Sequence, residues 1–373
     1  MRVNGVDRVL AGAVLLLCVL GTVLVWSAGG ASYAQKQVVN IAIGLVLMLL
    51  VMATDHRWVR ILAPLVYAAS VAGLVLVLTM GTTVNGSQSW LMLGGLSIQP
   101  SEFAKLAVVI GMALVIAERA EGSWRARVGV VDVLAMLAVA ALPAALILMQ
   151  PDLGTMLVLS ATVCGVLAAA GTPRRWLGLL ALGGVTAAVA AVSSGWLKDY
   201  QLDRFLAFTD PTLDPRGAGY NVEQARIAVG NGGLFGQGLF DGSQTQSGFV
   251  PEQHTDFVFT VAGEELGLVG AGLLIALLAV VLWRALRIAA RAEDVFGRVA
   301  AAGIACWLGF QAFQNVGMCL GIMPVTGVPL PFVSYGGSSM FAGLLAVGLL
   351  QNIHLRARSM PAVRPAPRVL VRA

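Results

Sequence analysis

The chain has 373 residues, of which 58% are apolar and only 12% are charged, and its mean hydropathy is +0.84. Soluble domains carry about a quarter charged residues, and no soluble core of this size could bury so much apolar surface. The composition therefore indicates a protein that crosses a membrane many times. The formal net charge of +5 does not indicate nucleic-acid binding, because the positive residues are dispersed in short clusters between apolar runs.

Ten apolar windows approach the length of about 20 residues that a membrane helix requires. They lie at residues 9–28, 37–53, 61–80, 101–117, 130–149, 155–170, 176–192, 257–282, 299–320 and 333–353. With the N-terminus placed inside, most of the 24 Lys and Arg residues fall in cytoplasmic segments. Positive residues favour that side of a membrane. We therefore predict an all-α polytopic membrane protein with ten transmembrane helices and both termini in the cytoplasm.

A large extracytoplasmic loop, residues 193–259, is predicted between the seventh and eighth helices, and it gathers much of the polar chemistry of the chain. Connections this long are uncommon unless they have a function, so we expect this loop to carry the active site. Residues 221–229 form a short amphipathic piece that could lie along the membrane surface. Residues 359–373 are predicted to be a disordered cytoplasmic tail, and residues 1–373 are expected to form a single membrane domain.

Three charged residues lie in or beside the predicted spans near the outer face. Glu102 and Lys105 are three residues apart in the fourth span, so they share a helix face and can pair. Asp152 follows the fifth span. Each such charge costs about 2.5–3.5 kcal/mol at a bilayer centre on insertion scales, so we expect the three to face a polar cavity. The alternatives are solvation in the interface and a structural ion pair.

Within the loop, residues 251–257 run directly into the eighth span, which holds Asp256 at a helix entrance. The alternative role for Asp256 is to cap that helix, as Asp commonly does. His254 could act as a base but has no obvious partner in the sequence. Glycines at 230–238 do not indicate a nucleotide site, because no βαβ pattern surrounds them; they favour tight turns, and the alternative is a close approach of the backbone to a phosphate or sugar. Residues 324–339 form another irregular polar segment, and such backbone is tolerated at membrane depth where it lines a cavity.

Several motifs in the same order along the chain resemble the SEDS family (shape, elongation, division and sporulation), which includes RodA and FtsW. The motifs are Gln99-Pro100-Ser101-Glu102 with Lys105, Gln150-Pro151-Asp152-Leu153-Gly154-Thr155, Gly217-Ala218-Gly219-Tyr220-Asn221 with Gln224, Pro251-Glu252-Gln253-His254-Thr255-Asp256-Phe257, Glu264-Glu265-Leu266-Gly267, and Pro329-Leu330-Pro331-Phe332-Val333-Ser334-Tyr335-Gly336-Gly337-Ser338-Ser339. The resemblance spans nearly the full length. Residues 243–246 and 326–329 resemble RodA more than FtsW.

The resemblance implies ten membrane helices and a peptidoglycan glycosyltransferase of the bacterial cytoplasmic (inner) membrane, with its active site on the extracytoplasmic face. Such enzymes polymerise lipid II, an undecaprenyl-pyrophosphate disaccharide-pentapeptide, together with a class B penicillin-binding protein that crosslinks the strand. The essential loop aspartate of the family corresponds to Asp256, and its polar cavity residues correspond to Glu102, Lys105 and Asp152. Further candidates for the substrate site are Arg204, Arg216, Tyr220, Gln224, Arg226, Gln244, Gln246, Glu252, His254, Ser334 and Ser338.

One departure from the family pattern concerns the cation that would meet the pyrophosphate. The family often has an Arg-Trp pair before the fourth span, where this chain has Ser89-Trp90. Lys105, Arg204, Arg216 and Arg226 are then the candidate cations. A divalent cation, Mg or Mn, is an open alternative, although the Asp-rich segments lack EF-hand spacing.

The expected reaction joins an acceptor GlcNAc 4-hydroxyl to the donor MurNAc anomeric carbon, with Asp256 as the general base. Near its reference pKa of about 3.9, an Asp is a weak base and must gain by positioning. Two other classes stay open at this point: a flippase for the lipid precursor and a non-catalytic scaffold for wall enzymes. Within the family, a role in division or sporulation is the alternative to elongation and rod shape.

Overall fold

A computed structural model describes residues 5–84, 87–93, 96–119, 128–194, 204, 208, 214 and 217–357. Among these residues, ten helices are long and apolar enough to cross a membrane. They are α1 (Arg8–Gly29), α2 (Ala31–Ala53), α3 (His56–Met80), α4 (Pro100–Arg119), α5 (Val130–Met149), α6 (Leu153–Ala170), α7 (Arg174–Ser193), α11 (Val258–Arg291), α12 (Val295–Cys319) and α13 (Gly337–Ala357). The predicted polytopic all-α fold is confirmed. The predicted tail, 359–373, lies outside the described residues.

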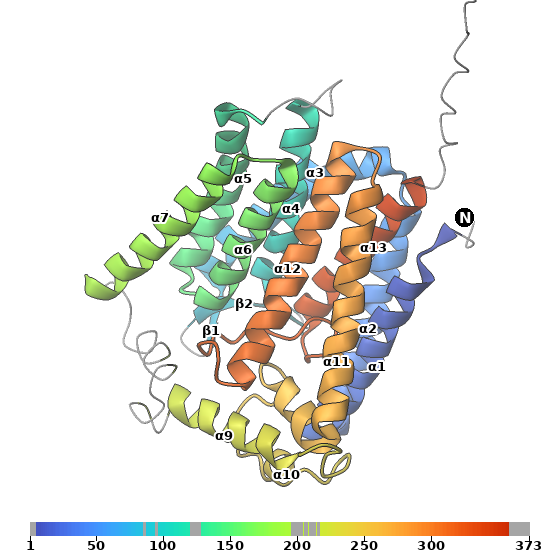
Figure 1. The fold of residues 1–373 in the computed structure, drawn as a ribbon, viewed down its shortest axis with the longest axis vertical. Coiled ribbons are helices and arrows are strands. Elements are labelled where there is room, and N and C mark those ends of the chain that lie inside the picture. Colours follow the sequence, from blue (N-terminus) through green and yellow to red (C-terminus); the bar gives the residue numbers. More distant parts are fainter. Residues whose placement is uncertain are drawn as a thin grey trace, which may run out of the picture.

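Two shorter helices, α9 (Ala218–Asn231) and α10 (Ser243–Ser247), belong to the long connection between α7 and α11. They lie together across one end of the bundle, which we call the loop end (Figure 1). The most buried spanning helices are α4, α12 and α13, and they form the centre of the bundle. The helix α7 lies at the edge beside α6, and none of its residues is buried.

A small sheet between α3 and α4 was not predicted from the sequence. Its strands are β1 (Thr82–Val84), β2 (Ser87–Leu93) and β3 (Leu96–Ile98), antiparallel in that order. Trp90 pairs with Thr82 and Leu91 with Ile98. The Ser87 hydroxyl donates to the carbonyl of Gln150 over 2.7 Å, which ties the sheet to the connection between α5 and α6.

The long helix α11 is interrupted at Gly267, where φ is 66° and ψ is −166°. Glycine adopts this backbone conformation without the steric cost of a Cβ. The break frees N–H and C=O groups that a loop then pairs. Leu268 N and Val269 N donate to the carbonyls of Gly233 and Leu234, while the N–H groups at 237 and 238 donate to the carbonyls at 264 and 265. The loop 232–238 therefore completes the hydrogen bonding of the helix.

Two adjacent buried glutamates fasten the rest of this loop to the bundle. The Glu264 carboxylate accepts from the backbone N–H groups of Gln244 and Thr245, at 2.7 and 2.9 Å, and from the Thr245 hydroxyl at 2.7 Å. The Glu265 carboxylate accepts from the hydroxyl of Ser27, at the end of α1, over 2.5 Å. Charge-assisted hydrogen bonds of this kind offset the cost of burying a carboxylate. They fix α10 against α11.

At the opposite end of the bundle, Asp7 joins three helices. Its carboxylate pairs with Arg284 of α11, whose Nε lies 2.8 Å away. Its backbone N–H donates to Gln351 of α13 over 2.9 Å, and the Gln351 amide donates back to the Asp7 carbonyl over 3.0 Å. Asp7 also caps α1 by accepting from the backbone N–H of Leu10. This network closes the bundle between its first and last spanning helices.

We predict that Asp7→Ala lowers the melting temperature of the detergent-solubilised chain, because it leaves the Arg284 side chain, which is only 15% exposed, without its carboxylate. Breaking a buried pair in this way costs about 3 kcal/mol or more. Asp55→Ala is a matched control, since exposed Asp55 only caps α3 by accepting from the N–H of Arg57, and loss of a cap costs about 1 kcal/mol. Equal melting temperatures for the two variants would show that the Asp7 network contributes nothing beyond a cap.

Candidate active site

A cavity of about 200 Å³ lies at the loop end, where α11 begins. Its lining comes from five separate parts of the chain: the small sheet with Gln99 after it, the connection between α5 and α6 with the start of α6, Arg204 in the long connection between α7 and α11, the segment just before α11, and the segment between α12 and α13 with the start of α13. The lining residues are Ser87, Ser89, Trp90, Gln99, Pro151, Asp152, Leu153, Arg204, Glu252, Thr255, Asp256, Thr326, Gly327, Pro329, Tyr335, Gly336, Ser338 and Ser339. Asp256 and Asp152, both singled out from the sequence, thus meet in one cavity.

Asp256 is held in place through its backbone. The carbonyl of Glu252 accepts from the N–H groups of Thr255, Asp256 and Phe257, so the segment is a compact set of turns. Asn315 of α12 donates its amide to the Asp256 carbonyl over 2.7 Å. The N-cap of α11 is Phe257, and no side chain caps this helix. The capping role considered for Asp256 is therefore wrong, and its carboxylate lines the cavity.

The surroundings of Asp256 change its acidity. Burial, together with the nearby carboxylates of Glu252 and Asp152, raises the pKa of Asp256 to about 7, while Arg204 acts in the opposite direction. Its side chain keeps part of its surface open to the cavity, but protein surrounds it closely enough for burial to dominate. The sequence-based expectation of an ordinary, weakly basic Asp therefore needs revision. A carboxylate with a pKa near neutrality is a better proton acceptor at physiological pH.

The backbone of Gly327 lies directly against the carboxylate of Asp256. A Cβ at this position would lie 3.1 Å from Asp256 Oδ2. The φ of Gly327 is 68°, in the left-handed region that other residues rarely adopt. Glycine is therefore required here both for the turn and for the close approach of the two segments.

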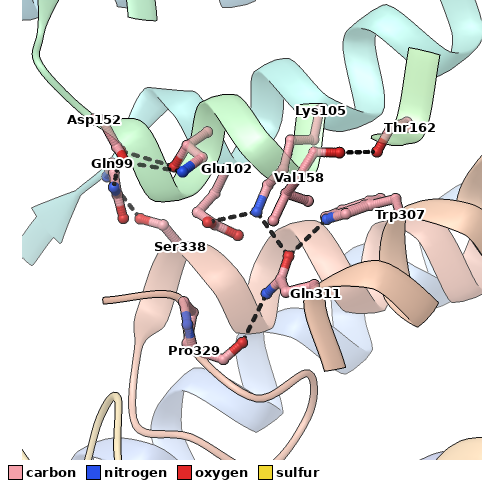
Figure 2. Close-up of polar contacts among 11 residues, drawn as sticks. Gln99, Glu102, Lys105, Asp152, Val158, Thr162, Trp307, Gln311, Pro329 and Ser338 are labelled. Atoms are coloured by element: carbon pink, nitrogen blue, oxygen red, sulfur yellow. Dashed lines mark hydrogen bonds and ion pairs between the residues drawn. The ribbon is translucent and has the colours of Figure 1, made fainter. Parts of the chain in front are cut away.

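Glu102 and Lys105 form the ion pair that their spacing predicts, with Lys105 Nζ 2.7 Å from Glu102 Oε1. Lys105 also donates to Gln311 over 2.8 Å, and Trp307 donates its indole N–H to the same amide oxygen over 2.7 Å (Figure 2). Lys105 is fully buried and Glu102 is 2% exposed. Neither is among the residues that line the cavity. The structure places this pair behind the cavity, as a link between α4 and α12.

Asp152 has two roles. It caps α6 by accepting from the N–H and the hydroxyl of Thr155, at 2.9 and 2.7 Å, and it also accepts from the Gln99 amide at 3.3 Å. Gln99 in turn donates its backbone N–H to the Ser338 hydroxyl over 2.8 Å. Figure 2 shows these contacts beside the Glu102–Lys105 pair. The motifs around 99, 152 and 338 thereby meet at one wall of the cavity.

Of the remaining candidates from the sequence, Glu252 and Arg204 line the cavity. His254, Ser334 and the candidates on α9 and α10 do not line it. His254 packs against the rings of Tyr33 and Tyr335, and burial lowers its pKa while Glu252 opposes this. Ser334 is buried and accepts from the N–H of Leu330. Tyr220, Gln224 and Arg226 lie on α9 and Gln244 and Gln246 on α10, and none of these five lines the cavity. Arg216 lies outside the described residues.

Several functional positions were missed from the sequence. Ser87 reaches the cavity only because the strands β1, β2 and β3 form a sheet, and the same sheet brings Ser89 and Trp90, noted from the sequence only as a departure from the family pattern, to the cavity. Asn315 lies in none of the quoted motifs, and yet it bonds both Asp256 and the carbonyl of Val328, over 2.7 and 2.8 Å. The signal that could have found it is an amide within an apolar span, because polar side chains are costly there unless they serve a purpose.

Comparison with known proteins matches the chain to one family over most of its length. A family model described as a cell cycle protein and named for FtsW, RodA and SpoVE matches residues 8–359. The peptidoglycan glycosyltransferase MrdB of Escherichia coli K12 is 38% identical over 93% of this chain and 92% of its own. The stage V sporulation protein E of Bacillus subtilis is 37% identical over 94% and 98%. A probable peptidoglycan glycosyltransferase FtsW from Allochromatium vinosum is 41% identical over 92% and 90%.

Solved structures agree with these relatives. The rod shape determining protein RodA of Thermus thermophilus has a TM-score of 0.71 at 32% identity, covering 95% of this chain and 98% of its own. A chain from a peptidoglycan synthase complex, described as coordinating polymerization and crosslinking, has a TM-score of 0.80 at 34% identity, covering 95% and 99%. Sequence, fold and the grouping of the motifs around one cavity agree, and the chain therefore belongs to the FtsW/RodA/SpoVE family of peptidoglycan glycosyltransferases.

Proposed function

We propose that this chain polymerises lipid II into glycan strands, with Asp256 as the general base. The observation that supports this role most directly is the position of Asp256: its carboxylate lines a polar cavity at the end of a membrane bundle, next to the cationic side chain of Arg204. A lipid-linked sugar pyrophosphate is an amphiphile whose polar part would enter such a cavity. The loop end then faces the extracytoplasmic side and both termini face the cytoplasm.

The proposed step moves one proton and exchanges one bond. Asp256 accepts the proton of the GlcNAc 4-hydroxyl as its oxygen bonds to the MurNAc anomeric carbon. The bond from that carbon to the pyrophosphate oxygen breaks, and undecaprenyl pyrophosphate leaves with the electron pair. The pyrophosphate is already a good leaving group, so the second carboxylic acid of glycosidases is not required. Arg204, which lines the same cavity, stabilises the negative charge of the leaving group in this proposal.

A divalent cation, Mg or Mn, is the alternative source of positive charge for the pyrophosphate. Among the described residues, no three His, Cys, Asp or Glu side chains come together closely enough to hold a metal ion. The cavity acids are Asp152, Glu252 and Asp256, and they do not form a complete set of ligands by themselves. The proposed reaction therefore assigns no step to a metal ion.

We also propose a partner protein and a cellular process for this chain. The likeness to a chain of a peptidoglycan synthase complex supports a class B penicillin-binding protein as the partner that crosslinks the product. Elongation and rod shape are proposed as the process, because the RodA-like motifs at 243–246 and 326–329 agree with the likeness to RodA.

The principal test measures glycan chains formed from purified lipid II by the native chain and by Asp256→Asn, each with the cognate transpeptidase. We expect the variant to lose about 10²–10⁴ in rate, the usual contribution of a general base, and to keep its fold and its partner. Equal polymer from both chains would overturn the role of Asp256 and move the search to Asp152 and Glu252, the other acids that line the cavity. If neither chain forms polymer, the flippase and scaffold functions take precedence.

The pH dependence of the same reaction reports the acidity of the base. Asp256 must be ionised to accept a proton, and its pKa is about 7, so kcat/KM should rise with pH and level off above this value. Glu252→Gln should move the midpoint to lower pH, because the Glu252 charge opposes ionisation of Asp256. A midpoint near 4 in the native chain would exclude the surroundings described here for the reacting carboxylate.

Gly327→Ala tests the close approach of the two cavity segments. The new Cβ would press on the Asp256 carboxylate and displace it, so glycan formation should fall strongly. Gly248→Ala is the matched control, because φ is 66° at Gly248 and nothing lies within 4 Å of its Cβ position. Both variants should lose about 1–2 kcal/mol of stability from the backbone, but only Gly327→Ala should lose activity. Equal activity losses would mean that backbone strain alone is responsible.

A further inference from the structure

A group of exposed apolar residues at the loop end does not line the cavity. It consists of Trp26, Leu234, Phe235, Phe240, Leu268 and Val269, which we call the apolar loop patch. Phe235 is 81% exposed, and Leu234, Leu268 and Val269 are each 60% exposed or more. The ring of Trp26 meets that of Phe240 edge to face, with 5.3 Å between centroids. Soluble surfaces rarely gather large apolar side chains in this way.

The position of the patch along α11 is set by backbone hydrogen bonds. Leu268 N donates to the Gly233 carbonyl over 2.9 Å, and Val269 N donates to the Leu234 carbonyl over 3.1 Å. Leu234 and Phe235 are therefore at the level of Leu268, directly after the break in the helix. The bond between Ser27 and Glu265 brings the end of α1, and with it Trp26, to nearly the same level.

The length of α11 relates this level to the membrane. A helix rises by about 1.5 Å per residue, so the stretch from Leu268 to Arg287 spans about 30 Å. That is the thickness of the hydrocarbon core of a typical bilayer. Arg287 and Arg291 then lie at one boundary, and Leu268 with the patch lies at the other. The exposed side chains of α11 between them, such as Leu273 and Ile275, face lipid.

We propose that the apolar loop patch inserts into the membrane interface at the loop end and anchors the loop 232–240 there. The patch continues the lipid-facing surface of α11 without a polar interruption at Leu268 and Val269, and aromatic side chains such as Trp26 favour this interface. Glycine contacts make the loop rigid: a Cβ on Gly236 or Gly267 would collide with the opposite backbone. Because the carbonyls of Glu264 and Glu265 accept from the N–H groups at 237 and 238 of the same loop, the anchor also fixes the first part of α11, which follows Asp256, relative to the membrane. This inference does not depend on the proposed function.

The test places a nitroxide label at Phe235→Cys in the full chain, reconstituted in vesicles of phosphatidylethanolamine and phosphatidylglycerol. Leu273→Cys, on the lipid-facing part of α11, serves as the reference for lipid, and Glu223→Cys, on the exposed face of α9, as the reference for water. The native chain, labelled in parallel, accounts for its four cysteines. Collisions of the label with oxygen, which concentrates in lipid, and with a water-soluble nickel chelate are measured by electron paramagnetic resonance.

The expected oxygen-to-nickel collision ratio at Phe235 is several-fold higher than at Glu223 and approaches that at Leu273. A ratio equal to that at Glu223 would place Phe235 in water and overturn the proposal. Suppressed collisions with both reagents would also overturn it, because they would show that protein, such as a second copy of the chain, covers the patch.

Discussion

The cavity depends on one side-chain amide near the loop end of α12. Asn315 of α12 donates to the carbonyls of Asp256 and Val328, which belong to the segments before α11 and after α12. A side-chain amide carries two N–H donors, and both are used to hold these segments together. Without this amide, each carbonyl would lose a hydrogen-bond donor, and an unpaired buried acceptor costs about 1–3 kcal/mol. The place of Asp256 thus follows from a residue that does not line the cavity.

Two glutamines of the same helix hold the segment 324–330 in the same way, by donating hydrogen bonds to its oxygen atoms. Gln314 donates to the Pro324 carbonyl and the Thr326 hydroxyl, and Gln311 donates to the Pro329 carbonyl. Gln311 is also the acceptor that connects Lys105 to this segment. The Glu102–Lys105 pair therefore joins α4 to this segment through Gln311, and it does so behind the cavity that its charge led us to expect it to face. Its burial stays tolerable because the ammonium has two oxygen acceptors and lies 5.3 Å from the centre of the Trp307 ring.

A second set of hydrogen bonds joins the long connection between α7 and α11 to the bundle. Glu264 and Glu265 lie in the first part of α11, before its break, and receive donors from α10 and α1. The break at Gly267 lets the loop 232–238 pair with α11 directly. Asn315 of α12 thus holds Asp256 directly, and the loop 232–238 fixes the helix α11 that follows it. Such rigidity suits a base that must meet a hydroxyl in a fixed geometry.

The sequence by itself determined the ten spans, the Glu102–Lys105 pairing and, through the family resemblance, the choice of Asp256. Hydropathy and helical spacing are local properties, so twenty consecutive residues are enough to show them. Only the tertiary structure decided that this pair lies behind the cavity, that the strands at 82–98 form one of its walls, and that Asn315 positions Asp256. It also decided the raised pKa of Asp256, because that value sums burial and the charges of Glu252, Arg204 and Asp152. Those groups come from different parts of the chain, and their distances exist only after folding.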